Sequence, residues 1–232
     1  ICRGLSTQYP GPGLLQIKQE MMFQNPTYTD TQITVTLKVT DFQPARQLVN
    51  MSTVIGLPDG KLACDGSTQI HLPGWKGGFP GIDESMAAAG DSKARSLKRL
   101  EIGQIAAAKR TFSGEDLAEY VALTKDTSPL FSDAEYARHL GFKDRIIPGP
   151  LLSGIFSDLL GTKLPGRGTN WLKQKLHFPA PAYVGDEISA TVEIIRLRPQ
   201  KDLVNLMGTC ANSNGELVCQ AQSLVFVRDL EE

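Results

Sequence analysis

The sequence predicts an α+β fold in which an antiparallel sheet wraps around one helix, and it predicts that this unit occurs twice in 232 residues. Three observations support the prediction. Two long segments of the chain repeat each other without gaps, one apolar segment has the pattern of a buried helix, and the runs that follow it alternate as strands do. A chain of this length can build one large domain or two smaller ones, each with its own core.

The repeat is visible in loops and in strands. "YPGPG" at 9–13 recurs as "LPGRG" at 164–168, which is a shift of 155 (164 − 9). At the same shift, "IKQEMMFQNPTY" at 17–28 lies over "LKQKLHFPAPAY" at 172–183. A register held over this length without a gap indicates two copies of one unit.

We place the first copy at residues 1–77, a linker at 78–99 and the second, complete copy at 100–232. The linker is rich in Gly, Ala, Ser and Lys and has no apolar period. Because the second copy begins near Leu100, the same shift places the start of the first copy before Ile1. We therefore expect the first copy to lack its N-terminal part.

The second copy contains three helix signals. In "FSGEDLAEYVALTK", Ser113 is an expected N-cap, with Asp116 three residues later. In "GPLLSGIFSDLLG", Pro150 stands in the first turn, the body is almost wholly apolar, and Gly161 is an expected stop. A helix that is apolar on all sides is expected to be buried. The segment "DAEYARHL" predicts a further helix with acidic residues in its first turn.

Strand-like runs follow the buried helix. They are "TNWLKQKLHF", "DEISATVEIIRL", "LVNLMGTCANS" and "ELVCQAQSLVFV", with Asn214-Gly215 as a hairpin turn between the last two. The first copy has their counterparts in "LLQIKQEMMF", "QITVTLKV", "QLVNMSTVIG" and "KLACDGSTQIHL". One buried helix inside a curled sheet of about five strands is the hotdog arrangement. Two in tandem make a double hotdog, which we expect to pack as a pseudo-dimer with continuous sheets.

Composition excludes several classes of function. A net charge of −1 gives no overall attraction to nucleic acid or acidic membranes, and no apolar run approaches the roughly 18 residues of a membrane span. The four cysteines are scattered without a CxxC pair, and there are only three His. We therefore expect no metal, no cofactor, no nucleic acid and no membrane, and reduced thiols in a cytoplasmic protein.

Residues 100–232 resemble the MaoC-like dehydratase family, particularly the (R)-specific enoyl-CoA hydratases. The resemblance is carried by the Asp-x-x-Pro turn in "TKDTSPLF", the Pro-Gly step before the buried helix, "LLGTKLPGRG" and "FPAPAYVGD". Residues 1–77 resemble the second half of the same domain. The family implies the hotdog fold and an acyl thioester as the ligand, carried by coenzyme A or by an acyl carrier protein.

The resemblance also implies site residues. The family's catalytic Asp falls on Asp126, the Gly whose N–H holds the thioester oxygen falls on Gly149, and the helix Ser that supports the Asp falls on Ser157. The catalytic His, five residues after the Asp, is replaced by Phe131, and the Asn between them by Ser128. We expect the substrate to contact Ser128, Pro129, Phe131 and Leu151.

The broken Asp/His pair leaves three functions open. The first is an enoyl-thioester hydratase or 3-hydroxyacyl-thioester dehydratase, with a complete pair expected in the part of the first copy before Ile1. The second is a thioester-binding or scaffolding protein without turnover, since Phe131 can neither accept nor donate a proton. The third is a hotdog thioesterase, which needs a carboxylate but no His. The expected partner is an acyl thioester, and homodimer formation is left open.

The histidines are candidates for a replacement base. His139 lies eight residues after Phe131 on a predicted helix, and we expect it at the surface. His177 stands in a strand where its counterpart in the first copy is Met22, so it is expected to pack or be exposed rather than react. His71, at a strand end, is expected to be solvated.

Overall fold

The computed structural model describes residues 1–7, 10–72 and 96–231, and it divides into two compact units. The first unit contains Ile1–Phe79, Thr111–Pro148 and Pro181–Asp186, and the second contains Pro80–Arg110, Gly149–Ala180 and Glu187–Glu232. Segment 111–148, which the sequence assigns to the second copy, therefore packs in the same unit as the first copy. The units are defined by packing and the copies by sequence, and the boundaries predicted for the copies stay a prediction.

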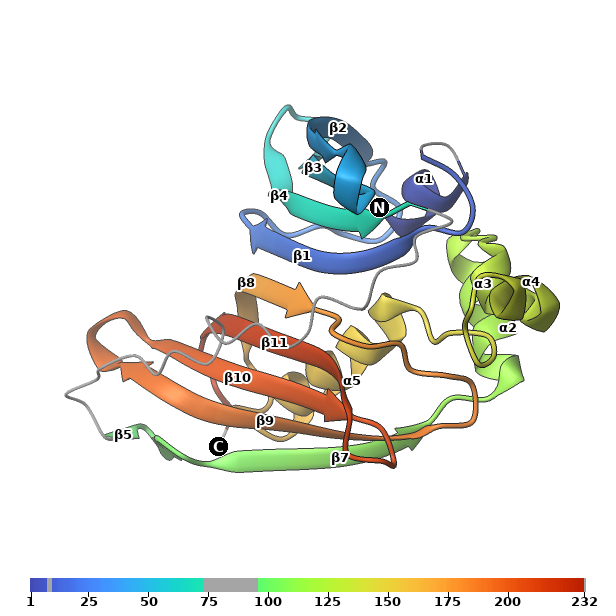
Figure 1. The fold of residues 1–232 in the computed structure, drawn as a ribbon. Coiled ribbons are helices and arrows are strands. Elements are labelled where there is room, and N and C mark those ends of the chain that lie inside the picture. Colours follow the sequence, from blue (N-terminus) through green and yellow to red (C-terminus); the bar gives the residue numbers. More distant parts are fainter. Residues whose placement is uncertain (8–9, 73–95, 232) are drawn as a thin grey trace. The chain divides into compact units, whose positions relative to one another are not determined.

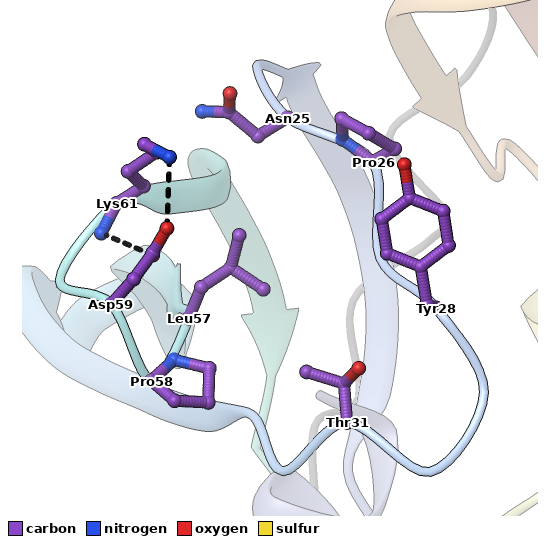
Figure 2. Close-up of a pocket in the computed structure, with 8 residues that line it drawn as sticks. All are labelled: Asn25, Pro26, Tyr28, Thr31, Leu57, Pro58, Asp59 and Lys61. Carbon is purple, nitrogen blue, oxygen red and sulfur yellow. Dashed lines mark hydrogen bonds and ion pairs between the residues drawn. The ribbon is translucent and has the colours of Figure 1, made fainter.

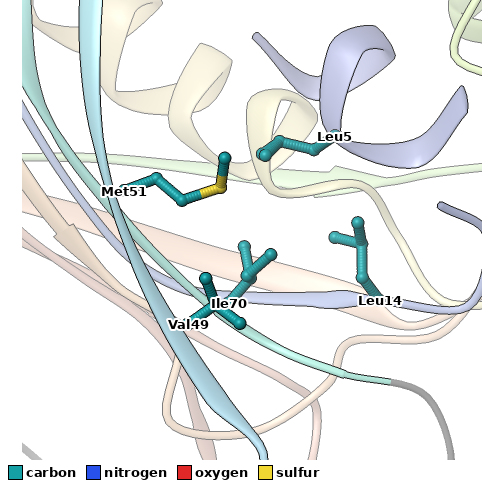
Figure 3. Close-up of a cluster of buried hydrophobic side chains, with 5 residues drawn as sticks. All are labelled: Leu5, Leu14, Val49, Met51 and Ile70. Carbon is teal, nitrogen blue, oxygen red and sulfur yellow. The ribbon is translucent and has the colours of Figure 1, made fainter. Parts of the chain in front are cut away.

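The first unit contains a four-stranded antiparallel sheet in the order β2-β3-β4-β1. Its strands are β1 (Leu15–Phe23), β2 (Thr34–Gln43), β3 (Leu48–Gly56) and β4 (Leu62–His71). The short helix α1 (Cys2–Thr7) packs on this sheet through Leu5. Figure 3 shows Leu5 over Leu14, Val49, Met51 and Ile70, which form the buried core of the unit.

Three helices complete the first unit: α2 (Gly114–Thr124), α3 (Pro129–Ser132) and α4 (Ala134–His139). A second buried cluster joins α3 to α4 through Leu130, Ala137 and Ile146. Segment 181–186 is attached by backbone hydrogen bonds, since the Ile147 N–H donates to the carbonyl of Ala182 at 2.7 Å. This packing fixes the chain on both sides of Asp126.

The second unit contains a sheet in the order β8-β11-β10-β9-β7. Its strands are β7 (Ile105–Thr111), β8 (Asn170–His177), β9 (Glu187–Arg198), β10 (Leu203–Ala211) and β11 (Leu217–Phe226), and two short strands, β5 (Ser96–Leu97) and β6 (Leu100–Glu101), pair separately. Helix α5 (Gly149–Thr162) packs against β9 and β11 (Figure 1). Gly208 of β10 makes room for it, because a Cβ there would lie 2.8 Å from the Phe156 ring.

The repeat found in the sequence is repeated in the backbone. A shift of 155 carries β3 (48–56) onto β10 (203–211) and β4 (62–71) onto β11 (217–226), in each case with both ends in register. It also carries the left-handed residue Gln47, with φ 50°, onto Asp202, with φ 51°. The β-bulges between Val39 and Asp41 and between Ile194 and Arg196 are equivalent too. The duplication predicted from sequence therefore holds at the level of individual turns.

Three details differ from the predictions. Helix α5 runs one residue past the expected stop at Gly161 and ends at Thr162. Strand β7 was not predicted, because its Ala run has no alternation of large side chains and Ala favours helices. Most of the predicted linker at 78–99 lies outside the described residues, and its described end begins with the short strand β5.

Candidate active site around Asp126

Helix α2 positions Asp126 directly after its end. Its N-terminus is closed by the predicted capping box, in which Ser113 accepts from the backbone N–H of Asp116 and Asp116 accepts from the backbone N–H of Ser113. Its C-cap, Lys125, adopts the left-handed conformation with φ 57°, and its N–H donates to the carbonyl of Val121 at 2.8 Å. The chain reverses direction there, and the Asp126 side chain is placed inside the unit.

The Asp126 carboxylate is buried, with 1% of its surface exposed, and each oxygen accepts a hydrogen bond. The hydroxyl of Tyr120, a residue of α2, donates to Oδ2 at 3.0 Å. The Ser6 hydroxyl, from α1, donates to Oδ1. Hydrogen bonds from hydroxyls to a charged carboxylate are stronger than neutral ones. Two groups from distant parts of the sequence therefore hold this carboxylate in place.

The phenol of Tyr120 and the thiol of Cys2, both near the carboxylate, stay protonated at neutral pH. Burial raises the pKa of Tyr120 well above its ordinary value, and the nearby Cys2 and Asp126 raise it further. Burial raises the pKa of the Cys2 thiol to about 11, and the charge of Asp126 acts in the same direction. Tyr120 is therefore a hydrogen-bond donor at neutral pH and cannot act as a base.

Phe131 lies beside this group, as its position in the sequence implied. Its ring meets the Tyr120 ring edge to face, with 6.0 Å between ring centroids and 86° between planes. Its other neighbours belong to the apolar cluster around Leu130. An aromatic hydrocarbon in this place packs but transfers no proton, and the replacement of a catalytic His by Phe131 stays a prediction.

Ser128 has a hydroxyl with no partner among the described residues. Its side chain is 1% exposed and its Oγ is buried. Its carbonyl accepts from the N–H of Phe131 at 3.1 Å, which closes the turn into α3 behind the half-buried Pro129. Because a buried hydroxyl without a partner costs free energy, this Oγ is a candidate contact for a water or a ligand.

The remaining predicted residues lie in the second unit. Gly149 begins α5, and a Cβ there would lie 2.8 Å from the Phe178 ring, so a larger residue would require the ring to shift. Leu151 is half-buried in the first turn of α5, and Ser157 is exposed on the same helix. The hydrogen bonds to Asp126 described above come from Ser6 and Tyr120, and the supporting role expected of Ser157 stays a prediction.

Sequence reasoning did not identify Ser6 or Tyr120 as partners of Asp126. A buried tyrosine hydroxyl needs a hydrogen-bond partner, and that signal points to a nearby acceptor. Ser6 is 120 residues from Asp126, and its counterpart in the second copy is Gly161, so neither spacing nor the repeat indicates it.

The three histidines lie in different surroundings. His139 is exposed at the end of α4, as expected. The expectation for His71 was wrong: it is 5% exposed, because β4 carries it into the core side of the sheet, and burial lowers its pKa. His177 is 1% exposed in β8. Within residues 1–7, 10–72 and 96–231, no group of three or more His, Cys, Asp and Glu could hold a metal ion.

The first unit also has a cavity of about 390 Å³, which is lined by other residues (Figure 2). It is bounded by Pro26 and Tyr28 on one side and by Leu57 and Pro58 on the other. Lys61 pairs with Asp59 at its edge at 2.9 Å. None of the predicted site residues lines it, so it carries no part of the expected chemistry.

Comparison with known proteins decides the family. Residues 101–221, more than half of the chain, match the family model described as FAS1-like, dehydratase domain region. The chain belongs to this dehydratase family. This chain is 37% identical over 130 residues to an (R)-specific enoyl-CoA hydratase of Aeromonas caviae. The match covers 56% of this chain and 97% of the relative.

Two further matches extend the comparison. A mitochondrial 3-hydroxyacyl-(acyl-carrier-protein) dehydratase of Solanum lycopersicum, FERN, is 34% identical over 141 residues, which cover 60% of this chain and 84% of the relative. A solved structure of a MaoC-like dehydratase superposes with a TM-score of 0.75 at 18% identity, over 97% of this chain and 79% of that one. The MaoC-like resemblance and the double-hotdog fold are therefore confirmed. Among the described residues, no helix is both long and apolar enough to cross a membrane.

Proposed function

We propose that the protein is an enoyl-thioester hydratase or 3-hydroxyacyl-thioester dehydratase whose Asp126 site lacks the second proton-transfer group. The observation that carries the proposal is the buried Asp126 carboxylate, held by two hydroxyls in a segment that aligns with an (R)-specific enoyl-CoA hydratase. The proposed substrate is an acyl thioester on coenzyme A or acyl carrier protein. We expect no cofactor, and a cytoplasmic location stays a prediction.

In the hydration direction, Asp126 takes a proton from water, and the hydroxide oxygen bonds to the β-carbon of the enoyl group. The electron pair of the double bond moves toward the thioester carbonyl, whose oxygen becomes enolate-like and is stabilised by a hydrogen-bond donor. The proton held by Asp126 then returns to the α-carbon. Atoms and charge balance with one carboxylate, and the reverse sequence removes water.

The hydrogen bonds of Asp126 set a condition on this step. An ionised carboxylate offers about four lone-pair positions, and Ser6 and Tyr120 use two of them. Water must use one of the remaining lone-pair positions or replace one of the two hydroxyls. Since a general acid or base typically contributes about 10²–10⁴-fold, the absence of a second group beside Asp126 predicts slow turnover.

Loss of the crotonyl-CoA double bond, followed by absorbance, tests the proposal. The expected result is slow hydration by the wild-type chain that falls to the uncatalysed rate in Asp126→Asn. Absence of hydration in the wild type contradicts the proposal. Retention of the full rate in Asp126→Asn contradicts the role of Asp126.

The second candidate is a thioester-binding protein without turnover. It is favoured by one observation: the carboxylate is 1% exposed and both of its oxygens are already engaged. A non-reactive saturated analogue, butyryl-CoA, distinguishes the two functions. Saturable binding of butyryl-CoA without hydration of crotonyl-CoA supports this candidate over the enzyme.

A further inference from the structure

One end of the core face of the first sheet carries exposed apolar side chains. Val35 of β2, Ile55 of β3 and Cys64 of β4 are paired in one row, which Phe23 of β1 completes. Residues paired in this way point to the same face of a sheet. Cys64 is buried in the middle of the row, but Val35 at one end is 40% exposed and Phe23 at the other is 39% exposed. The row is therefore apolar across four strands and open at both ends.

The repeat identifies the equivalent row in the second unit. A shift of 155 carries the four residues of the open row onto Phe178, Ala190, Cys210 and Cys219. The last three are paired with one another across β9, β10 and β11. Each of these three is 0% exposed, and Phe178 is 6% exposed. Two equivalent apolar rows thus differ, because the row in the second unit is covered and the row in the first unit is open.

The first turns of α5 cover the row in the second unit. A Cβ on Gly149, the first residue of α5, would lie 2.8 Å from the Phe178 ring at the end of that row. Two turns later, the Phe156 ring lies against Gly208, which is two residues from Cys210 on β10. Helix α5 therefore starts over the covered row and continues onto the next inward-facing positions of the sheet.

Helix α1 holds the place of the last part of α5. The shift of 155 carries α1 onto residues 157–162, and both helices end at the same position of the repeat. Helix α1 packs over the cluster that includes Leu5 and the half-buried Leu37 of β2. Leu37 is two residues beyond Val35 on the same face, so α1 lies next to the open row without covering it. The place that residues 149–155 hold on the second sheet is thus open on the first.

We propose that the open row is the binding surface for an apolar α-helix that lies in line with α1. The second unit covers the equivalent row with such a helix, and α1 ends in register with it. The helix packs large aliphatic side chains, spaced as Leu152 and Ile155 are in α5, against Val35 and Phe23. The proposal concerns an interaction surface and is independent of catalysis at Asp126.

A grafted helix tests this surface. The sequence "GPLLSGI", copied from residues 149–155, is placed before Ile1, so that Ile1 takes the position of Phe156 in the repeat. The helix is tethered because an isolated helix of this length is marginal in water. We expect the graft to raise the thermal unfolding midpoint by at least about 4 °C and to lower the fluorescence of ANS, a dye that binds exposed apolar surface.

The control graft has serine in place of the copies of Leu152 and Ile155, the two residues of the segment expected to contact the row. It should change the unfolding midpoint by no more than about 1 °C, since serine adds no apolar surface to bury. A graft that stabilises the chain no more than its serine control overturns the proposal.

Val35→Lys tests the contact with the row, and Thr36→Lys is its matched control. Both add one charge at an exposed position of β2, but Thr36 points to the opposite face of the sheet. Val35→Lys should remove at least half of the stabilisation that the graft gives, whereas Thr36→Lys should keep it. Because the graft is compared with the ungrafted chain in each background, the effect of the substitution alone cancels. Equal stabilisation in both backgrounds places the grafted helix elsewhere and overturns the proposal.

Two other occupants give different results with the ungrafted chain. If a second copy of the chain covers the row, sedimentation velocity shows a dimer that Val35→Lys dissociates and Thr36→Lys does not. If an acyl chain covers it, the fluorescent fatty acid cis-parinaric acid binds, and Val35→Lys alone abolishes this binding. Either result overturns the proposal. Since these variants leave Asp126 untouched, crotonyl-CoA hydration by them reports separately on the proposed function.

Discussion

Replacing Tyr120 by Phe removes one hydroxyl, and with it the hydrogen bond to Asp126, and keeps the ring that packs on Phe131. That bond is 3.0 Å long, and Asp126 is 1% exposed, so water has no access to the oxygen left behind. Hydrogen bonds to charged groups contribute about 1.5–3 kcal/mol. The folding equilibrium constant should therefore fall by roughly 10- to 150-fold.

Urea denaturation followed by circular dichroism measures this change. Tyr136→Phe is the control, because it also removes one tyrosine hydroxyl, from a residue that is half-buried in the cluster around Leu130. It should change the free energy of unfolding by no more than about 0.5 kcal/mol. Tyr120→Phe and Asp126→Asn share one interaction, so the double variant should cost less than the sum of the single variants. A Tyr120→Phe effect as small as the control, or strict additivity, would refute the reasoning.

Two further predictions concern packing and pH. Gly149→Ala should lower the free energy of unfolding by about 1–3 kcal/mol, because its Cβ meets the Phe178 ring. In contrast, Gly154→Ala in the same helix meets nothing within 4 Å and should raise it by up to about 1 kcal/mol; equal effects in urea denaturation would contradict this. Burial raises the pKa of Cys2 and Cys64 to about 11 and of Cys210 to about 12, from an ordinary 9.0. Unfolded thiols therefore ionise first, so stability present below pH 9 should be lost as the pH rises toward 11. Urea denaturation across this pH range measures how steeply the free energy of unfolding falls with pH, and Cys210→Ser should make that fall less steep. A free energy of unfolding that does not change with pH would contradict the prediction.

The fold could be predicted because duplication leaves its signal in every turn. A shift of 155 found in loop motifs also aligns β3 with β10 and β4 with β11 to the residue. Local rules sufficed for the capping box of α2, where Ser113 and Asp116 are three residues apart. They failed for β7, because pairing with its neighbour β9 determines its strand conformation rather than the intrinsic preference of its residues.

The site was predictable only in part. The resemblance located Asp126 and Phe131, and the structure brings both against Tyr120. The donor from α1, Ser6, depends on packing between segments 120 residues apart, which no local pattern encodes. Equivalent positions can also differ in environment: Val39 of β2 is 38% exposed, whereas its counterpart Ile194 is fully buried in the unit built around α5.

The central claim is that Asp126 belongs to a thioester reaction site in which Phe131 has replaced the second proton-transfer group. Its most direct test is the rate of crotonyl-CoA hydration by Phe131→His. We predict a rise of about 10²–10⁴-fold over the wild-type chain, abolished when Asp126→Asn is added. A correctly folded Phe131→His variant that is no faster than wild type, or an increase that persists without the Asp126 carboxylate, would contradict the account.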